Sequence, residues 1–314
     1  MLRRGFLTSS LATTLAACGG VGGLAQLPSE VSETWPPLGQ FVDVDGAKIH
    51  AWDQGRGHPV VMIHGASGNL RDWTFDLAPE IARKHRAIAF DRPGFGYSER
   101  LDHQTGDPAA QARTLASAAR KLGAQKPILV GHSLGAAVAM AWALAEPDSI
   151  AGVVSISGAV MPWSSKPMLA EQIGLDDLLV GLYFDYLRSS APRGGIERFV
   201  TRVFRPQPVP EGYLDYVGGP LSLKPSAMAA NKQDVTVLNT ALRRQAPDYG
   251  RIGVPVEVIS GTNDFIIDTQ RQPIPFAQRL PNSRLTLLDG VGHMAHHVAA
   301  EQVFAAIDRI AAAK

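Results

Sequence analysis

The stretch LVGHSLGAA at residues 129–137 places one serine, Ser133, at the point where an apolar run gives way to an alanine-rich one. The residues before it, PILVGHS, are typical of a buried strand, and residues 134–145 are typical of a helix. A chain that turns from strand to helix within two or three residues crowds its own corner, and Gly131 and Gly135 relieve that crowding. The sequence therefore predicts a strand–serine–helix corner, with the hydroxyl at a sheet edge close to the free NH groups of the helix start.

Short strand-like runs alternate with helical stretches on both sides of this corner. The expected strands are two hairpin runs joined at Asp45-Gly46, then PVVMIHG, RAIAF, PILVGHS, IAGVVSIS, VPVEVIS and SRLTLLD, and the expected helices cover 73–84, 107–122, 134–145, 269–280 and 299–312. Strands that alternate with helices in this way predict an α/β fold, in which helices cover both faces of a mostly parallel, twisted sheet.

The alternation stops between IAGVVSIS and VPVEVIS. The intervening residues, 159–249, are rich in proline, glycine and aromatic side chains. A segment of this length is expected to bury part of its apolar surface. We interpret residues 159–249 as an inserted cap, mainly helical, and residues 38–158 with 250–314 as the body that carries it.

The N-terminal residues have the pattern of an export signal: a basic start, a short apolar stretch, and small residues before a cysteine. Residues 15–18, LAAC, resemble the lipobox of bacterial lipoproteins, in which the cysteine becomes the lipidated first residue. Arg3 and Arg4 lie in a segment that resembles a twin-arginine signal. We expect a signal peptide over 1–17, lipidation at Cys18, and a flexible tether over 18–37. A soluble periplasmic or secreted protein is the alternative.

Bulk composition limits the partners and the covalent cross-links. The chain has 314 residues, of which 45% are hydrophobic and 19% charged, and a formal net charge of +1. This balance does not suggest nucleic acid as a partner, and a small molecule is the expected one. Cys18 is the only cysteine, so the mature chain is expected to be stabilised by packing without an internal disulfide.

A serine hydroxyl is a poor nucleophile until a base accepts its proton, so the corner at Ser133 requires a histidine and a carboxylate that orients the histidine. Candidates occur where two later strand-like runs end. Asp264 follows VEVIS, and His293 follows RLTLLD. Asp268 is the second candidate for the carboxylate. The sequence therefore predicts a Ser133–His293–Asp264 triad.

The motifs now form one ordered set. HGAS and DRPGFGYS precede the GHSLG corner, and Asp264 and His293 follow it. This order resembles the α/β-hydrolase superfamily over residues 40–312. The resemblance implies a serine hydrolase that uses neither a cofactor nor a metal ion.

The resemblance also implies a role for each matching residue. Ser133 is the nucleophile, His293 the general base, and Asp264 the residue that fixes the imidazole tautomer. The backbone NH groups of Ala66 and Leu134 are expected to bind the oxyanion.

Other polar residues near these motifs have different interpretations. We expect His64 to hydrogen-bond its own loop, Asp91 to brace its own turn through backbone NH groups, and His132 to point away from the site. His296 and His297 are interpreted as helix-start residues, with a place at the pocket mouth as the alternative. Histidines and carboxylates gather at ligand spacing only at His293, His296 and His297, and a metal-free site is preferred.

The expected reaction is acyl transfer to water. Relatives that cleave carbon–halogen bonds or epoxides carry aspartate where this chain has Ser133, so the serine favours hydrolysis of carboxylic esters with small or medium apolar acyl groups. Three alternatives use the same triad: hydrolysis of a carbon–carbon bond in a β-diketone, hydrolysis of a lactone, and cofactor-free formation of a peracid. An alternative of another class is a non-catalytic, lipid-anchored binding module.

Overall fold

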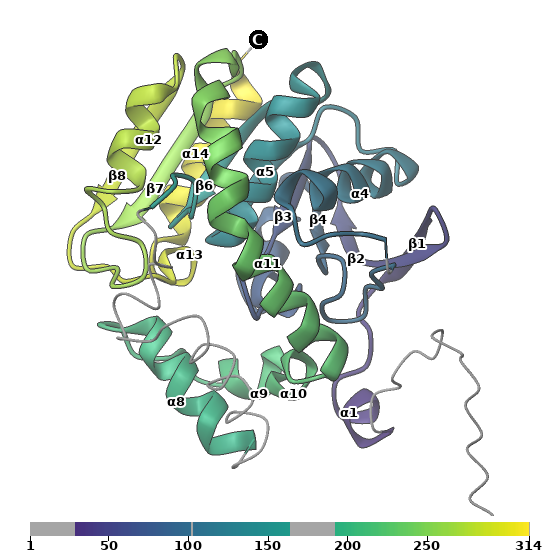
Figure 1. Ribbon diagram of the computed structural model, residues 1–314. Coiled ribbons are helices and arrows are strands. Elements are labelled where there is room, and N and C mark those ends of the chain that lie inside the picture. The colour runs from purple at the N-terminus through teal and green to yellow at the C-terminus, as the bar shows by residue number, and fades with distance from the viewer. Residues whose placement is uncertain (1–28, 102, 164–191, 314) are drawn as a thin grey trace, which may run out of the picture.

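The computed structural model describes residues 29–101, 103–163 and 192–313, and these form an eight-stranded sheet with helices on both faces (Figure 1). The strands are β1 (Gln40–Val44), β2 (Ala47–Gly55), β3 (Pro59–Ile63), β4 (Arg86–Phe90), β5 (Ile128–His132), β6 (Gly152–Ile156), β7 (Val256–Gly261) and β8 (Ser283–Leu288). Their order across the sheet is β1-β2-β4-β3-β5-β6-β7-β8. The expected α/β fold class is confirmed.

The sheet is antiparallel at one edge and parallel elsewhere. β1 pairs with β2 and β2 with β4 in antiparallel fashion, whereas all pairs from β4 to β8 are parallel. The β1–β2 turn uses Asp45 and Gly46, both at positive φ (54° and 88°), which suits a two-residue hairpin between twisted strands. The parallel strands all end at one edge, and that edge receives the predicted site residues.

Side chains of the central strands alternate between two apolar layers. The α-helices of the body that follow β1 are α2 (Arg71–Thr74), α3 (Leu77–Ile81), α4 (Pro108–Lys121), α5 (Leu134–Ala145), α12 (Pro273–Arg279), α13 (Ala295–Val298) and α14 (Ala300–Ala312). In β3, Val61 and Ile63 belong to the layer under α4, α5 and α12, whereas Val60 and Met62 belong to the layer under α2, α3 and α14. This period of two is expected of a strand buried on both faces.

Four described helices lie between β6 and β7, where the sequence predicted an inserted, helical cap. They are α8 (Pro192–Phe204), α9 (Tyr213–Val217), α10 (Gly219–Ser222) and α11 (Pro225–Gln245). Figure 1 shows α8, α9 and α10 gathered at one end of the sheet and α11 leading from them back toward the side of α5. Residues 164–191 of the expected cap lie outside the described residues.

Three expectations about local structure are corrected. The helix expected over 73–84 is two short helices, α2 and α3, because the chain turns at Asp76, whose carboxylate caps α3 by accepting from the NH of Leu77. The helix expected over 269–280 begins only at Pro273. The tether expected over 18–37 is not free throughout, because residues 29–34 form the helix α1 (Ser29–Thr34).

The expected signal peptide and Cys18 lie outside the described residues. Within the residues that are described, none of the helices combines the length and the apolar character needed to cross a bilayer.

Candidate active site

Ser133 stands at a strained corner between β5 and α5. Its backbone has φ 52° and ψ −119°, a conformation that costs a non-glycine residue about 1–3 kcal/mol. The flanking glycines are required by space. A Cβ on Gly131 would lie 2.6 Å from Cα of Ala136, and a Cβ on Gly135 would lie 2.1 Å from the carbonyl oxygen of Ile63. The structure therefore has the strand–serine–helix corner that the sequence predicted.

His293 and Asp264 meet at the same edge of the sheet. Asp264 follows β7 and His293 follows β8, and the Nδ1–H of His293 donates to Oδ2 of Asp264 over 2.8 Å. The other carboxylate oxygen accepts from the backbone NH groups of Ile266 and Ile267, at 2.8 and 2.9 Å. Asp264 is thus fixed by its own loop, and it fixes the tautomer that leaves Nε2 of His293 able to accept a proton.

Asp268, the second candidate for the carboxylate, is placed differently. Its Oδ1 accepts from the NH of Gln270 in its own turn, and its Oδ2 faces Arg271 at 3.8 Å. Asp264 is the carboxylate that is paired with His293.

A cavity of about 210 Å³ lies beside these groups, and both Ser133 and His293 line it. One wall is apolar and comes from α8, which contributes Ile196, Phe199, Val200, Val203 and Phe204. Further lining comes from α9, α11 and the loop after β3. Ser133 and His293 therefore share a space that is bounded by both the sheet edge and the cap.

The loop after β3 is held by the cap. Ala66 lines the cavity, and Leu134 is buried as the first residue of α5. The next loop residue, Ser67, has φ 57°, and its NH donates to Oδ1 of Asn231 on α11 over 2.9 Å. The Asn231 amide returns a hydrogen bond to the Ser67 hydroxyl, also at 2.9 Å. A cap residue that the sequence did not single out thus fixes the conformation next to the predicted oxyanion NH of Ala66.

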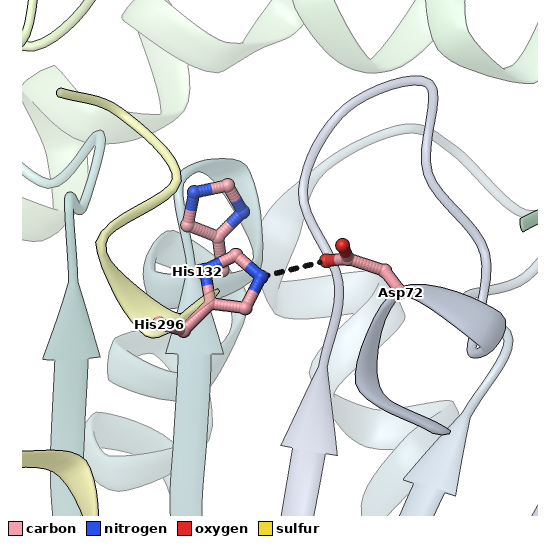
Figure 2. A group of neighbouring side chains, drawn as sticks. All are labelled: Asp72, His132 and His296. Atoms are coloured by element: carbon pink, nitrogen blue, oxygen red, sulfur yellow. Dashed lines mark hydrogen bonds and ion pairs between the residues drawn. The ribbon is translucent and has the colours of Figure 1, made fainter. Parts of the chain in front are cut away.

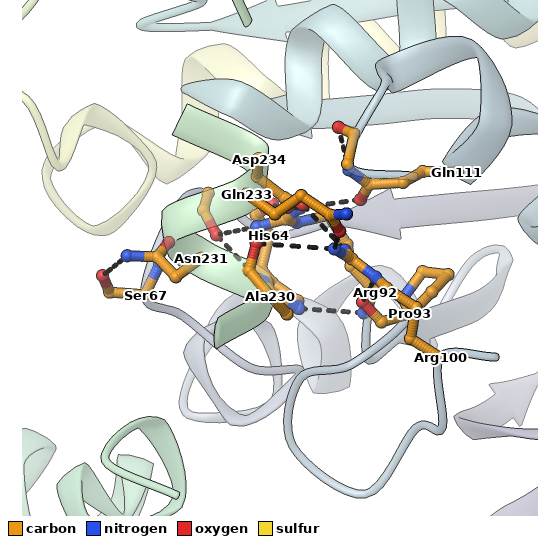
Figure 3. Close-up of polar contacts among 12 residues, drawn as sticks. His64, Ser67, Arg92, Pro93, Arg100, Gln111, Ala230, Asn231, Gln233 and Asp234 are labelled. Carbon is orange, nitrogen blue, oxygen red and sulfur yellow. Dashed lines mark hydrogen bonds and ion pairs between the residues drawn. The ribbon is translucent and has the colours of Figure 1, made fainter. Parts of the chain in front are cut away.

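A buried ion pair joins the same helix to the core (Figure 3). Nη1 of Arg92, which follows β4, lies 2.5 Å from Oδ2 of Asp234 on α11, and neither side chain is exposed. Arg100 approaches the other oxygen of Asp234 at 2.8 Å. Arg92 also donates to the carbonyl oxygens of His64 and Gly65, at 3.0 Å each. One guanidinium therefore connects α11 to the loop that precedes Ala66.

His64 and Asp91 make structural hydrogen bonds of the kind that was expected. The backbone NH of Arg92 donates to Nε2 of His64, so Nδ1 carries the proton and donates to the carbonyl of Gly65 over 2.8 Å. Burial, together with the nearby Arg92 charge, lowers the pKa of His64 to about 3. Asp91 accepts from the NH groups of Leu70 and Tyr97, at 2.7 and 2.8 Å.

A second polar cluster, around His297, lies close to His132. Both ring nitrogens of His297 donate, Nε2 to Asp72 over 2.9 Å and Nδ1 to Asp76 over 2.7 Å, which requires the charged imidazolium. Burial alone would lower the pKa of His297, but the two carboxylates raise it to about 9. Asp72 also accepts from Nε2 of His296 at 3.1 Å and from the hydroxyl of Tyr213 on α9 at 2.7 Å. His296 and His297 begin α13, as expected, and tie it to α2.

The prediction that His132 points away from the site is wrong. Its ring lies 4.7 Å from that of His293 and 4.4 Å from that of His296, and its Nε2–H donates to the backbone carbonyl of His293 over 3.1 Å. Burial, with the neighbouring histidines, holds the pKa of His132 well below its usual value. A neutral His132 therefore supports the backbone of the base.

Within the described residues, one group of side chains has the spacing of a metal site. Donor atoms of Asp72, His132 and His296 lie within 4.8 Å of one another (Figure 2). The sequence had grouped His293, His296 and His297, and the structure brings together a different set. An ion between these donors would displace the His296–Asp72 hydrogen bond, and His132 already donates to a backbone carbonyl. His132 and His296 thus each use Nε2 in a hydrogen bond, and we assign no step to a metal ion.

A family comparison agrees with the fold and the motif order. Residues 58–300 match the model of the alpha/beta hydrolase fold family. The chain belongs to this family.

Among curated proteins, a 2-hydroxymuconate semialdehyde hydrolase of Pseudomonas putida is 28% identical over 286 residues, which cover 82% of this chain and 88% of that protein. The acetyltransferase component of an acetoin cleaving system, also of Pseudomonas putida, is 28% identical over 85% of this chain and 67% of its own length. Among solved structures, a thermophilic esterase from Thermogutta terrifontis superimposes with a TM-score of 0.69 at 23% identity, over 86% of this chain and 97% of the esterase. The family match and the semialdehyde hydrolase support a hydrolase, and the esterase shows the same fold.

Proposed function

We propose that the protein is a serine hydrolase that cleaves carboxylic esters with neutral, apolar acyl groups. The observation that carries this proposal is the shared cavity, in which a strained serine and a carboxylate-oriented histidine face an apolar wall. A hydroxyl and an imidazole that line one cavity, next to backbone NH groups at a helix start, form the arrangement that acyl transfer requires.

The proposed reaction follows from the positions of these groups. Ser133 attacks the ester carbonyl while Nε2 of His293 accepts its proton, and Asp264 stabilises the imidazolium. The NH groups of Ala66 and Leu134 bind the oxyanion. His293 then returns the proton to the departing alcohol, and a water molecule, activated by the same base, releases the acid.

The same triad is also suited to hydrolysis of a carbon–carbon bond, and a curated relative that is named a 2-hydroxymuconate semialdehyde hydrolase favours that second candidate. Such a substrate carries a carboxylate. Among the described residues that line the cavity there is no lysine or arginine, and the charged one is Asp72. Burial of an unpaired carboxylate is costly, so this lining supports a neutral acyl group.

The first experiment tests the nucleophile. We expect a fluorophosphonate probe to label the protein and p-nitrophenyl butyrate to be hydrolysed, and Ser133→Ala to abolish both. Ser222 also lines the cavity, so Ser222→Ala is the matched control and should keep both activities. A folded protein that is not labelled would favour the non-catalytic binding module.

The second experiment tests the acyl group. A p-nitrophenyl ester of butyric acid and one of succinic acid have the same chain length but differ by a terminal carboxylate. We expect kcat/KM to be at least tenfold higher for the butyrate. Preference for the succinate, or turnover of a vinylogous β-diketone acid in place of either ester, would support the carbon–carbon bond hydrolase.

We also propose that the protein is exported and held to a membrane by a lipid on Cys18, on the basis of the signal-like residues 1–17 and the lipobox-like LAAC. Cys18→Ala should move the protein from the membrane fraction to the soluble fraction. Unchanged fractionation would contradict the anchor.

A further inference from the structure

The chain between the expected lipid anchor and β1 rests on the cap. Nε1 of Trp35 donates to the backbone carbonyl of Asp215 on α9 over 2.5 Å. A Cβ on Gly218, which follows α9, would lie 2.9 Å from Cγ of the Trp35 ring, so the indole is in contact with this backbone. Trp35 therefore touches α9 through both a hydrogen bond and its ring.

Arg71 holds the same two segments together from the core side. Its Nη2 donates to the carbonyl of Pro36 over 2.5 Å, and its Nη1 donates to the carbonyl of Tyr216 over 3.3 Å. The hydroxyl of Tyr97 donates to the carbonyl of Trp35. Arg71 is buried at the start of α2, and its guanidinium donates to the carbonyls of Pro36 and Tyr216.

The helix α9 is not able to hold its own position. It has five residues and lies between two glycines in the left-handed region, Gly212 (φ 77°) and Gly218 (φ 65°). A helix this short is unstable without tertiary contacts. Its inner side contributes Tyr213 and Val217 to the cavity lining. Any displacement of α9 therefore changes the shape of the cavity.

We propose that Trp35 is a positioning residue for the substrate cavity, because it holds α9 in the place where Tyr213 and Val217 form part of the cavity wall. This inference rests on the proposed ester hydrolase. Loss of Trp35 removes the contact between α9 and the segment before β1, while α9 keeps its hydrogen bonds to Asn69, Asp72 and Thr74. The less firmly held wall then binds the apolar part of the substrate less well. The chemistry at Ser133 is unaffected.

The test compares full-length chains that carry Trp35→Ala, Trp35→Phe or Glu33→Ala, an exposed change in the same segment. For p-nitrophenyl hexanoate we expect Trp35→Ala to raise KM about tenfold with kcat changed less than threefold, and a much smaller rise for the acetate. Trp35→Phe keeps the ring but loses the NH donor, so it should raise KM by a few fold. Glu33→Ala should match the parent chain.

Three outcomes overturn the inference. The first is that KM for the hexanoate is unchanged in both Trp35 variants, and the second is that only kcat falls. The third is that the melting temperature falls while the dependence of KM on acyl chain length stays the same. If Trp35→Ala does not fold, the KM values of Trp35→Phe decide. Fluorophosphonate labelling of the parent chain separates the two proposals. A parent chain that is not labelled refutes the hydrolase, whereas a labelled and active chain with an indifferent Trp35 refutes only the positioning role.

Discussion

The Nδ1–H of His293 donates to Oδ2 of Asp264 over 2.8 Å, across 29 residues of sequence. The carboxylate is fixed in turn by two backbone NH groups of its own loop. Both side chains are buried, and the hydrogen bond to the carboxylate favours the tautomer in which Nδ1 of His293 carries the proton. The proposed hydrolase activity depends on this hydrogen bond between His293 and Asp264.

Asp264→Asn should lower kcat by roughly 10⁴-fold, because the amide presents an NH group to Nδ1 and favours the wrong imidazole tautomer. Hydrolysis of p-nitrophenyl butyrate measures the effect. Asp268→Asn is the control and should stay within a few fold of the parent chain. A larger loss of kcat in the Asp268 variant would show that Asp268, and not Asp264, orients His293.

Asn231→Ala should lower kcat by about 10- to 100-fold with little change in KM, because the loop that carries the NH of Ala66 loses both hydrogen bonds at Ser67. Steady-state kinetics check the split between kcat and KM. Lys232→Ala, an exposed change next to Asn231 on the same helix, should have little effect. Equal losses of kcat in the two variants would show that any change on α11 lowers activity, whether or not it removes the hydrogen bonds at Ser67.

Gly135→Ala should abolish activity and destabilise the fold, since the new methyl carbon would lie 2.1 Å from a backbone oxygen of β3. Gly253→Ala is the matched control, because a Cβ there meets nothing within 4 Å. Thermal unfolding and fluorophosphonate labelling measure the two effects. A stable, labelled Gly135→Ala protein would contradict the close approach of α5 and β3.

Replacing Asp234 with Leu should lower the free energy of unfolding by about 3–5 kcal/mol, because the buried Arg92 charge loses its carboxylate. Replacing Arg92 with Met should lower it less, because Asp234 keeps its contact with Arg100. The double replacement should be less destabilising than the sum of the two single changes. Urea unfolding of the four chains measures the coupling. Strict additivity would mean that the two side chains do not interact.

The stability should also fall as the pH rises through the range in which His297 loses its proton. Its pKa is raised from 6.5 in the unfolded chain to about 9 in the folded protein, so its contribution is fully present below pH 6.5 and is lost as the pH approaches 9. Urea unfolding at pH 6.5 and at pH 9 should show the difference. His297→Asn should be less stable at pH 6.5 and should lack this pH dependence.

The fold and the corner at Ser133 could be predicted because their causes are local. A buried strand, two crowded glycines and an Ala-rich helix are adjacent in sequence, and Asp264 and His293 each follow a strand that ends at the same edge. The alternation of strands and helices predicts a parallel sheet, and residues that directly follow parallel strands lie at one edge of that sheet. The break between α2 and α3 was missed because it depends on a single capping carboxylate, Asp76.

The contacts between cap and core could not be predicted in the same way. Asn231 is an ordinary polar residue of a long helix, and its partner Ser67 is 164 residues away. Asp72 and His297 are separated by 225 residues, and no spacing in the sequence connects them. Such pairs depend on how the cap lies on the sheet, which is a property of tertiary packing.

With the proposed lipid on Cys18, the docking of Trp35 on α9 would also limit how far the body stands from a bilayer. Residues 19–28 lie between Cys18 and α1, and a fully extended chain of this length spans at most roughly 40 Å. A lipid on Cys18 would therefore keep the cap side of the molecule within a few nanometres of the membrane surface. Esters that partition into that surface would then be met at their interfacial concentration, which is far above their concentration in the surrounding water.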